Sequence, residues 1–514
     1  MMNYKRVTFS VVLSLVLLWA GSYPLQAQEP TRIPSVLMQK TEQGSTAEFF
    51  VILREQADLQ EATYRRGKAK AHYVYQQLWQ TAQQSQRSLT TQLKKQNIPY
   101  HSFYIINALL VEGDRKVLTS LAAHPDVMAV EANTQLRGLR LPNDAVPSIS
   151  QRPQTGGMIE PNLIYVNADD VWAMGYRGQG IVIGGQDTGY DWTHPALAGK
   201  YRGGSGSLVN HDYNWHDSIH TTAFNSSCGT DSPEPCDDHL HGTHTMGIAV
   251  GDDGLGNQIG MAPEAQWIGC RNMDEGHGTP ATYLECFEFF LAPYPLGGTP
   301  AQGNPELAPD VTINSWSCPQ LEGCTWQTLQ AAVNAQRAAG IMTVGSAGNE
   351  GLSGCRSVIN PPGIYDAVYS VGALNQSFTG LASFSSRGPV TIDGSNRLKP
   401  DITAPGTQIR SSMLNNSYGS ISGTSMAAPH VAGAVALLWS AVPALKNEVV
   451  LTEIYLNGQA THIDDDTCDS PGTSWPNMAY GYGHLDIERS IQHALQNPPS
   501  WLYLPLILSD SSLD

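Results

Sequence analysis

From residue 165 onward the chain alternates short apolar runs with helical patterns, and this alternation limits the folds that it can adopt. The apolar runs predict strands at 181–184, 267–271, 311–315, 341–345 and 367–372. The helical patterns predict helices at 280–291, 326–339 and 425–440. Strands that alternate with helices are joined by right-handed crossovers, so the sequence predicts an α/β fold with a mostly parallel central sheet flanked by helices. In such a sheet, functional residues gather at the carboxyl ends of the strands.

Two candidate functional residues stand at the ends of predicted elements. Asp187 follows the first strand in the segment Gln-Asp-Thr-Gly, where an Asx turn is the structural alternative. His241 opens the segment His-Gly-Thr-His, whose second histidine, His244, lies three positions later on the same helix face. Such a pair could bind a metal, but the Glu that metalloproteases place after the first His is absent. We therefore expect no metal site at this pair.

The third candidate, Ser425, lies where a loop becomes the last predicted helix. Small residues surround it in the segment Gly-Thr-Ser-Met-Ala-Ala-Pro-His at 423–430, so another backbone can approach closely. We expect Pro429 in the first helical turn, where a missing N–H breaks no helical hydrogen bond. A serine here lies at the positive end of the helix dipole. The alternative role is a helix N-cap, which is the commoner function of an isolated serine before an apolar run.

The chain order Asp187, His241, Ser425 is that of the subtilisin triad. Together with Ser-Ala-Gly-Asn-Glu-Gly at 346–351, the three segments make residues 160–490 resemble the subtilisin-like serine peptidases. The resemblance implies that Ser425 attacks a peptide carbonyl, that His241 accepts its proton, and that Asp187 holds the histidine ring. It also implies that Asn349 donates to the oxyanion beside the backbone N–H of Ser425.

By the same resemblance, two short segments flank an extended peptide substrate. They are Gly276, His277 and Gly278 on one side and Ser315, Trp316 and Ser317 on the other. Main-chain groups of such segments give affinity, and pockets give selectivity. Trp316 would line the primary pocket and favour apolar side chains, although a tryptophan after a buried strand is more often part of the core. Glu350 would stand at the rim of that pocket and could admit Lys or Arg.

Two other functions are alternatives to a serine endopeptidase. An α/β-hydrolase esterase also uses Ser, His and Asp, but it requires the order Ser, Asp, His and a Gly where this chain has Ala427. A catalytically silent, peptide-binding relative would be expected to lack a triad or oxyanion residue, and all four are present here.

The N-terminus predicts secretion. Within residues 1–27, two basic residues precede an apolar run at 7–20, and Leu-Gln-Ala at 25–27 fits a signal-peptidase site. We therefore expect an extracellular protein whose eight cysteines meet an oxidising compartment. Their spacing predicts the local disulfides Cys228–Cys236 and Cys318–Cys324, and no Cys-x-x-Cys spacing favours a metal. The four remaining cysteines, Cys270, Cys286, Cys355 and Cys468, leave two bridges of open connectivity.

Residues 48–140 form a separate unit. Its patterns predict a strand at 49–53, a long Gln-rich helix at 59–96, and strands at 102–111 and 127–131 that flank a helix at 115–123. We expect a small α+β domain, then a linker at 141–161 rich in Pro, Gly and Ser, then the peptidase domain at 162–496. The resemblance implies that 48–140 is a propeptide that assists folding and inhibits the enzyme with its C-terminal tail. Self-cleavage would fall between residues 135 and 158.

The two parts carry opposite charge. Residues 48–140 hold 12 Lys and Arg against 8 Asp and Glu, a net charge of +4, whereas residues 141–514 hold 13 against 36, a net charge of −23. This asymmetry favours docking of the first part on the second and argues against nucleic acid as a partner. The expected partners of this monomeric protein are polypeptide substrates and its own propeptide.

Three features depart from the compact subtilisins. The chain is longer between Asp187 and His241, in a loop with Cys228 and Cys236, and an extension at 292–309 is rich in Pro and Gly. Both would lie near the rim of the cleft. The apolar tail within 497–514 is too short to cross a bilayer.

The resemblance implies a structural calcium site that this sequence matches only in part. Ala196 follows His-Pro where the resemblance implies a carboxylate ligand, so one ligand is missing. Asp252, Asp253 and Asn257 supply oxygens of the kind that Ca²⁺ uses, but surface turns contain the same residues. The reaction itself requires no cofactor.

Overall fold

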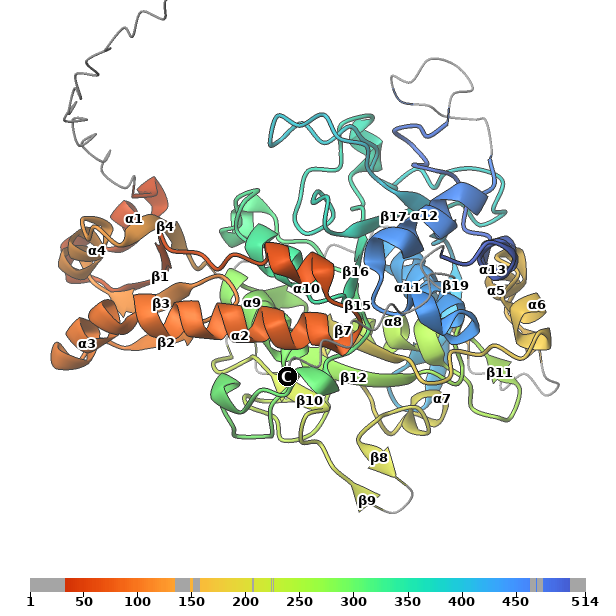
Figure 1. Ribbon diagram of the computed structural model, residues 1–514, viewed down its shortest axis with the longest axis horizontal. Helices are drawn as coiled ribbons and strands as arrows, with labels where there is room; N and C mark the ends of the chain where they lie inside the picture. The colour runs from red at the N-terminus through yellow and green to blue at the C-terminus, as the bar shows by residue number, and fades with distance from the viewer. Residues whose placement is uncertain are drawn as a thin grey trace, which may run out of the picture.

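The computed structural model describes residues 33–134, 148–150, 158–205, 208–222, 224, 226–462, 468 and 475–499. The expected signal peptide, most of the linker and all but the first residues of the C-terminal tail lie outside the described residues. A small α+β domain leads into a larger α/β domain (Figure 1). None of the described helices combines the length and the apolar character that a membrane span needs.

The N-terminal domain is built on a four-stranded antiparallel sheet of order β2-β3-β1-β4. Its elements are α1 (Ser35–Lys40), β1 (Ala47–Leu53), α2 (Lys68–Ser85), α3 (Arg87–Lys95), β2 (Tyr100–Phe103), β3 (Ala108–Gly113), α4 (Arg115–Ala122) and β4 (Val127–Ala132). The predicted helix at 59–96 is wrong as a single element, because it is interrupted at Gly67, where φ is 53°, and at Gln86. The predicted strand at 102–111 is a hairpin, because Asn107 adopts a φ of 44° between β2 and β3.

The larger domain is organised around seven strands in which every neighbouring pair is parallel, in the order β10-β12-β7-β15-β16-β17-β18. They are β7 (Val182–Asp187), β10 (Trp215–Asp217), β12 (Gln266–Arg271), β15 (Val311–Asn314), β16 (Met342–Ser346), β17 (Tyr369–Leu374) and β18 (Ile402–Pro405). The five predicted strands are confirmed, with ends shifted by a few residues. The outer strands β10 and β18 were not predicted.

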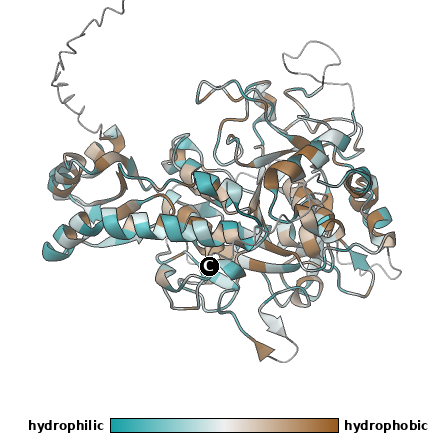
Figure 2. Cartoon of the chain, viewed as in Figure 1, coloured by the Kyte–Doolittle hydropathy of each residue, from teal (hydrophilic) through white to brown (hydrophobic). Residues whose placement is uncertain are grey.

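Helices cover both faces of this sheet. On one face α8 (His241–Val250) packs beside α11 (Thr424–Ala441), and on the other α9 (Pro280–Leu291) packs beside α10 (Gln330–Ala338) (Figure 1). Nearly all residues of α11 are buried, whereas α2 buries one stripe, and Figure 2 shows this contrast in hydropathy. The predicted start of α10 at 326 is wrong, because Thr325 to Thr328 form a hydrogen-bonded turn before the helix begins.

Shorter elements complete the domain. The helices are α5 (Pro161–Tyr165), α6 (Ala168–Ala173), α7 (Pro195–Ala198), α12 (Val449–Gln459) and α13 (Ile487–Gln496). The strands are β5 (Ser148–Ser150), β6 (Met158–Ile159), β8 (Gly204–Ser205), β9 (Leu208–Val209), β11 (Asn257–Gln258), β13 (Met273–Asp274), β14 (His277–Gly278), β19 (Ile409–Met413) and β20 (Ser417–Ile421).

All eight cysteines form disulfides within the larger domain. The two predicted local bridges, Cys228–Cys236 and Cys318–Cys324, are confirmed. The connectivity that the sequence left open is Cys270–Cys286, which ties β12 to α9, and Cys355–Cys468.

The N-terminal domain docks on α9 and α10. Glu288 of α9 accepts hydrogen bonds from the backbone N–H groups of Tyr104 and Ile105, the latter at 2.9 Å. Apolar side chains of both domains share one buried cluster that includes Phe50 and Val74 on one side and Phe287 on the other. The interface therefore combines a shared apolar core with backbone hydrogen bonds.

Candidate active site

The candidate residues lie at the carboxyl edge of the parallel sheet. The chain order of the strands reverses between β7 and β15, since β12 lies on one side of β7 and β15 on the other. Asp187 is the last residue of β7, and Ser315 directly follows β15. Such a reversal point leaves a crevice in which α/β proteins bind ligands.

Asp187 and His241 form a buried pair. The Nδ1 atom of His241 lies 2.7 Å from Oδ1 of Asp187, and the two side chains are 0% and 1% exposed. The same Oδ1 accepts the backbone N–H of Thr188 at 2.8 Å, so the Asx-type contact and the histidine contact coexist. Among the described residues, Nε2 of His241 has no hydrogen-bond partner. One ring nitrogen is thus held by a carboxylate, and the other is free to take a proton.

Charge around His241 opposes the effect of burial. Burial alone lowers the pKa of the imidazole. The Asp187 carboxylate opposes this through its charge and its hydrogen bond, and the charge of Asp237 adds to the effect. Together they leave the pKa of His241 raised above its usual value. The neighbouring His244 has no such support: its ring contacts the carbonyl of Gly419 at 3.2 Å, and burial lowers its pKa to about 3. Of the two histidines, only His241 can stabilise a positive charge at neutral pH.

Ser425 lies in the first turn of α11 and is not its N-cap. Gly423 occupies the N-cap position without a side-chain cap. The Oγ atom of Ser425 donates to the carbonyl oxygen of Ser315 at 2.8 Å. No hydrogen bond joins Oγ to His241 in the part of the chain that the structure describes. In enzymes without substrate, catalytic hydrogen bonds are often long or misaligned, so this geometry is compatible with a nucleophile.

The expected place of Pro429 in the first turn is wrong. Pro429 lies inside α11. Because proline has no N–H, the helical hydrogen bond from position 429 to the carbonyl oxygen of Ser425 is missing. That oxygen instead accepts the hydroxyl of Ser315 at 2.8 Å. The proline therefore leaves a free acceptor beside the candidate nucleophile, and Ser315 occupies it.

Asn349 presents its amide nitrogen toward the same place. Its Oδ1 accepts both the backbone N–H and the hydroxyl of Thr424, each at 2.9 Å, which fixes the amide with Nδ2 on the other side. A Cβ built on Gly423 would lie 3.7 Å from Nδ2 of Asn349 and 3.6 Å from the backbone nitrogen of Ser425. Both nitrogens therefore lie within 4 Å of one point beside the serine, and two such donors are what an oxyanion requires.

The two expected substrate segments border this region. Gly276 and the adjoining β14 belong to the hairpin β13–β14, and Ser315 to Ser317 follow β15. Trp316 is buried and stacks flat on Tyr283, with ring centroids 4.1 Å apart and planes at 4°. This packing favours the core role for Trp316 over an open pocket wall.

Glu350 turns back toward its own loop. Its carboxylate accepts the hydroxyl of Ser386 at 2.9 Å, and Asn360 lies 3.4 Å away. These contacts occupy the group that would otherwise carry charge at a pocket rim.

The oxygens considered as possible calcium ligands are engaged by protein donors. Asp253 accepts the backbone N–H groups of Leu255 and Asn257 and the hydroxyl of Tyr418. Asp252 accepts the N–H of Gly254. Within the described residues no group of three or more His, Cys, Asp or Glu side chains could hold a metal ion. The contacts are those of a surface turn.

Sequence reasoning missed the role of Asp237 and the contact of Ser315 with Ser425. Ser315, expected only as a substrate-binding residue, exchanges hydrogen bonds with Ser425, and Asp237, four positions before the start of α8, raises the pKa of His241. Neither position follows from periodicity. The signal that could have found Asp237 is its place shortly before His241, where carboxylates often cap a helix.

Comparison with known proteins places these residues in a family. The model of the subtilase family matches residues 178–483. The chain is 36% identical over 429 residues to Bacillopeptidase F of Bacillus subtilis, an alignment that covers 80% of this chain but only 28% of that protein. It is 30% identical over 328 residues to subtilisin DY of Bacillus licheniformis, which covers 64% of this chain and 96% of that protein. The chain therefore belongs to the subtilase family and is a subtilisin-like serine endopeptidase.

Proposed function

We propose that the protein is a secreted endopeptidase, made as a self-processing precursor, in which Asp187, His241 and Ser425 form the catalytic triad. The observation that carries this proposal is the buried Asp187–His241 pair, whose Nε2 has no hydrogen-bond partner within the described parts of the chain. A serine hydroxyl is a weak nucleophile until a neighbouring base accepts its proton, and an imidazole held by a carboxylate is suited to this task.

In the proposed reaction, Ser425 turns from the carbonyl of Ser315 to His241 and attacks the peptide carbonyl. Nε2 of His241 accepts the hydroxyl proton and later gives it to the leaving amine, while Asp187 stabilises the imidazolium. The negative oxygen of the tetrahedral intermediate is bound by Nδ2 of Asn349 and the backbone N–H of Ser425. Water then hydrolyses the acyl-enzyme by the same proton transfers. No cofactor takes part.

The N-terminal domain is proposed to be an intramolecular inhibitor. Its last described residues, 132–134, contact the chain shortly after each of the two segments assigned to substrate binding: Asn133 accepts the N–H of Ala281 at the start of α9, and a Cβ on Gly323 would lie 2.4 Å from the hydroxyl oxygen of Thr134. Opposite net charge supports the docking, and Lys70 pairs with Glu448 at 2.8 Å.

The decisive experiment compares the full chain with its Ser425→Ala variant. We expect the wild type to shorten itself by removal of the N-terminal domain and then to hydrolyse casein, and the variant to remain full-length and inactive. Ser377→Ala, at an exposed turn, is the matched serine control and should behave as the wild type. Clean maturation of the Ser425→Ala variant without added protease would refute self-processing. Absence of hydrolysis by processed wild type would favour the silent peptide-binding alternative.

A further inference from the structure

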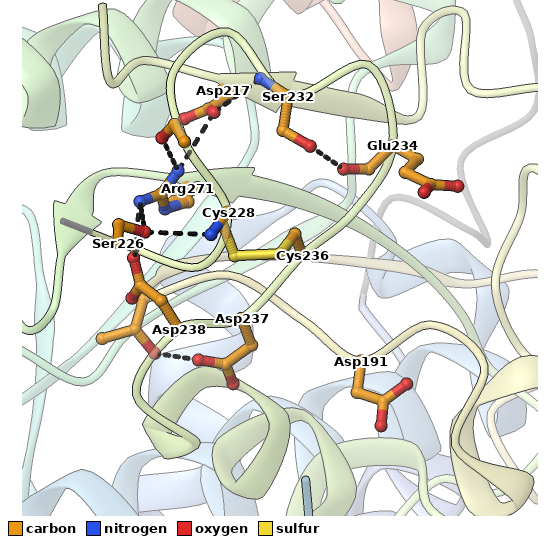
Figure 3. The surroundings of a disulfide bond; sticks show 12 residues. Asp191, Asp217, Ser226, Cys228, Ser232, Glu234, Cys236, Asp237, Asp238 and Arg271 are labelled. Carbon is orange, nitrogen blue, oxygen red and sulfur yellow. Dashed lines mark hydrogen bonds and ion pairs between the residues drawn. A yellow bond between two sulfur atoms is a disulfide. The ribbon is translucent and has the colours of Figure 1, made fainter. Parts of the chain in front are cut away.

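The loop inserted between Asp187 and His241 ends in two adjacent carboxylates that point to different places. The disulfide Cys228–Cys236 closes the loop directly before Asp237 and Asp238. Figure 3 shows Asp238 turned toward Ser226 and Arg271, whereas Asp237 is turned away from them. The two neighbours therefore serve different surroundings.

Asp237 connects the turn after Asp187 with the first turn of α8. Its Oδ1 accepts the hydroxyl of Thr188 at 2.8 Å and the backbone N–H groups of His239 and Leu240 at 3.0 and 2.9 Å. Its Oδ2 accepts the backbone N–H and the hydroxyl of Thr243 at 2.9 and 2.6 Å. Five donors thus meet one buried carboxylate, and His241 lies between them in the chain. Movement of this carboxylate would shift the histidine relative to Asp187.

Asp238 holds the edge assigned to substrate binding. Its Oδ1 accepts the backbone N–H of Glu275 at 3.1 Å, in the turn of the hairpin β13–β14. Its Oδ2 lies 2.5 Å from Nη2 of Arg271, whose guanidinium also contacts Asp274 of the same hairpin at 3.0 Å. Arg271 is fully buried and ends β12, in register with Asp187 of β7. The hairpin is therefore tied to the rigid edge of the sheet.

Other contacts fasten the inserted loop to the same hairpin. Asp217 pairs with Arg271 at 3.2 Å, and Thr222 donates to Asp274 at 2.7 Å. Phe224 stacks on His277 with ring centroids 4.1 Å apart. The loop also packs tightly against the turn after Asp187: a Cβ on Gly189, where φ is 106°, would lie 1.7 Å from the carbonyl oxygen of Cys236. The disulfide closes the chain between these attachments and Asp237.

We propose that Asp237 and Asp238 are positioning residues with separate roles, Asp237 for the catalytic histidine and Asp238 for the substrate-binding hairpin, and that the disulfide-closed loop aligns the two. This inference rests on the proposed triad. Under this proposal the inserted loop contributes to catalysis, because it connects the catalytic base His241 with the substrate-binding hairpin β13–β14.

The roles predict a split in steady-state kinetics. Asp237→Asn should lower kcat on the order of 10²-fold, the loss expected for a misplaced catalytic group, and leave KM nearly unchanged. Asp238→Asn should raise KM about tenfold, the equivalent of one charge-assisted hydrogen bond, and leave kcat nearly unchanged. Asp231→Asn is the matched control, since Asp231 lies on the same loop but its exposed carboxylate pairs only with His220 among the described residues. It should leave both constants as in the wild type.

The pH profile supplies a readout that a merely structural role would not move. The carboxylates of Asp187 and Asp237 raise the pKa of His241, while the nearby His239 and His244 have lowered pKa values and are neutral near pH 7. Loss of the Asp237 charge should therefore shift the acid limb of kcat/KM to lower pH. Asp238→Asn should leave that limb in place.

Mature enzyme is used throughout, and variants that fail to process themselves are cleaved by tagged wild-type enzyme, which is then removed. A serine-directed inhibitor counts competent sites, so that kcat refers to folded enzyme. The double variant Cys228→Ser/Cys236→Ser opens the loop without changing either carboxylate. It should lower kcat and raise KM together. The proposal is overturned if Asp237→Asn and Asp238→Asn change kcat and KM in the same proportion, or if both change only the melting temperature. Activity in Ser425→Ala would instead refute the triad itself.

Discussion

The two domains of this peptidase are stabilised in different ways. The larger domain contains all four disulfides and a seven-stranded sheet covered by helices on both faces. The N-terminal domain has no cysteine and a four-stranded sheet, and part of its apolar surface belongs to a buried cluster shared with the larger domain. The larger domain is cross-linked covalently, whereas the N-terminal domain combines a small core of its own with apolar contacts to its partner.

This difference fits the proposed division of labour. In the proposed secreted enzyme, disulfides stabilise the domain that must stay folded. The proposed inhibitor must dissociate, and non-covalent contacts allow its release. The largest effects of substitution are therefore expected within the larger domain, moderate effects at the interface, and the smallest in exposed turns.

The disulfide Cys355–Cys468 should give the largest effect. It closes 113 residues of chain, and a loop of about 100 residues corresponds to about 4.7 kcal/mol of stabilisation by restriction of the unfolded state. We expect the Cys355→Ala/Cys468→Ala double variant to lose about this much unfolding free energy, measured by urea denaturation of the inhibited mature enzyme. The Cys318→Ala/Cys324→Ala variant, which opens a much shorter loop, is the control and should lose less. Equal losses would show that loop length does not govern stability here.

Within the site, Asn349→Ala should lower kcat by about 10²–10³-fold with little change in KM. The reason is that Nδ2 is expected to bind the oxygen only when it becomes negative, and one such donor contributes about 3–4 kcal/mol in the transition state. Asn349→Asp retains the acceptor for Thr424 but removes the donor, and should be equally slow. A wild-type kcat in either variant would show that Asn349 takes no part in the reaction.

At the interface, Glu288 should contribute less but with a distinctive pH dependence. Glu288→Ala leaves two backbone N–H groups of the N-terminal domain without an acceptor, so inhibition by that domain should weaken by about 1–3 kcal/mol. Burial raises the pKa of Glu288 to about 8 in the docked state, although the two N–H donors oppose this. With the ordinary pKa of 4.5 taken for this carboxyl after undocking, the stability of the complex is fully present below pH 4.5 and is lost as the pH rises through about 8.

The measurement is the inhibition constant of the released N-terminal domain on mature enzyme between pH 5 and pH 9. It should rise with pH for the wild type and stay level for Glu288→Gln, which keeps an acceptor but cannot ionise. A rise of the same size in the Gln variant would assign the pH dependence to another group.

The sequence predicted the central strands and helices well because each was a clear apolar run, as in 267–271 and 280–291. It failed where tertiary contacts decide the outcome. Gly67 and Gln86 interrupt the predicted long helix, and the buried amide of Gln86 bonds to the carbonyl of Phe103 across the fold. At the site, the motif residues Asp187 and His241 were found by their order in the chain, but their contact is one between segments 54 positions apart. The roles of Asp237 and Ser315 depend on such contacts alone.

The smallest effect is expected in the turn once considered for calcium. A bound ion at a hundred times its dissociation constant would add about 2.7 kcal/mol, and each kcal/mol corresponds to about 2–4 °C in Tm for a domain of 150–250 residues. The oxygens of Asp253 instead accept two backbone N–H groups, the amide of Asn257 and the hydroxyl of Tyr418. An ion would have to displace these donors, so we expect a chelator to leave the Tm of the inhibited mature enzyme unchanged. A fall of several degrees that added Ca²⁺ reverses would contradict this, and if Asp253→Asn abolished the fall, the ion would lie in this turn.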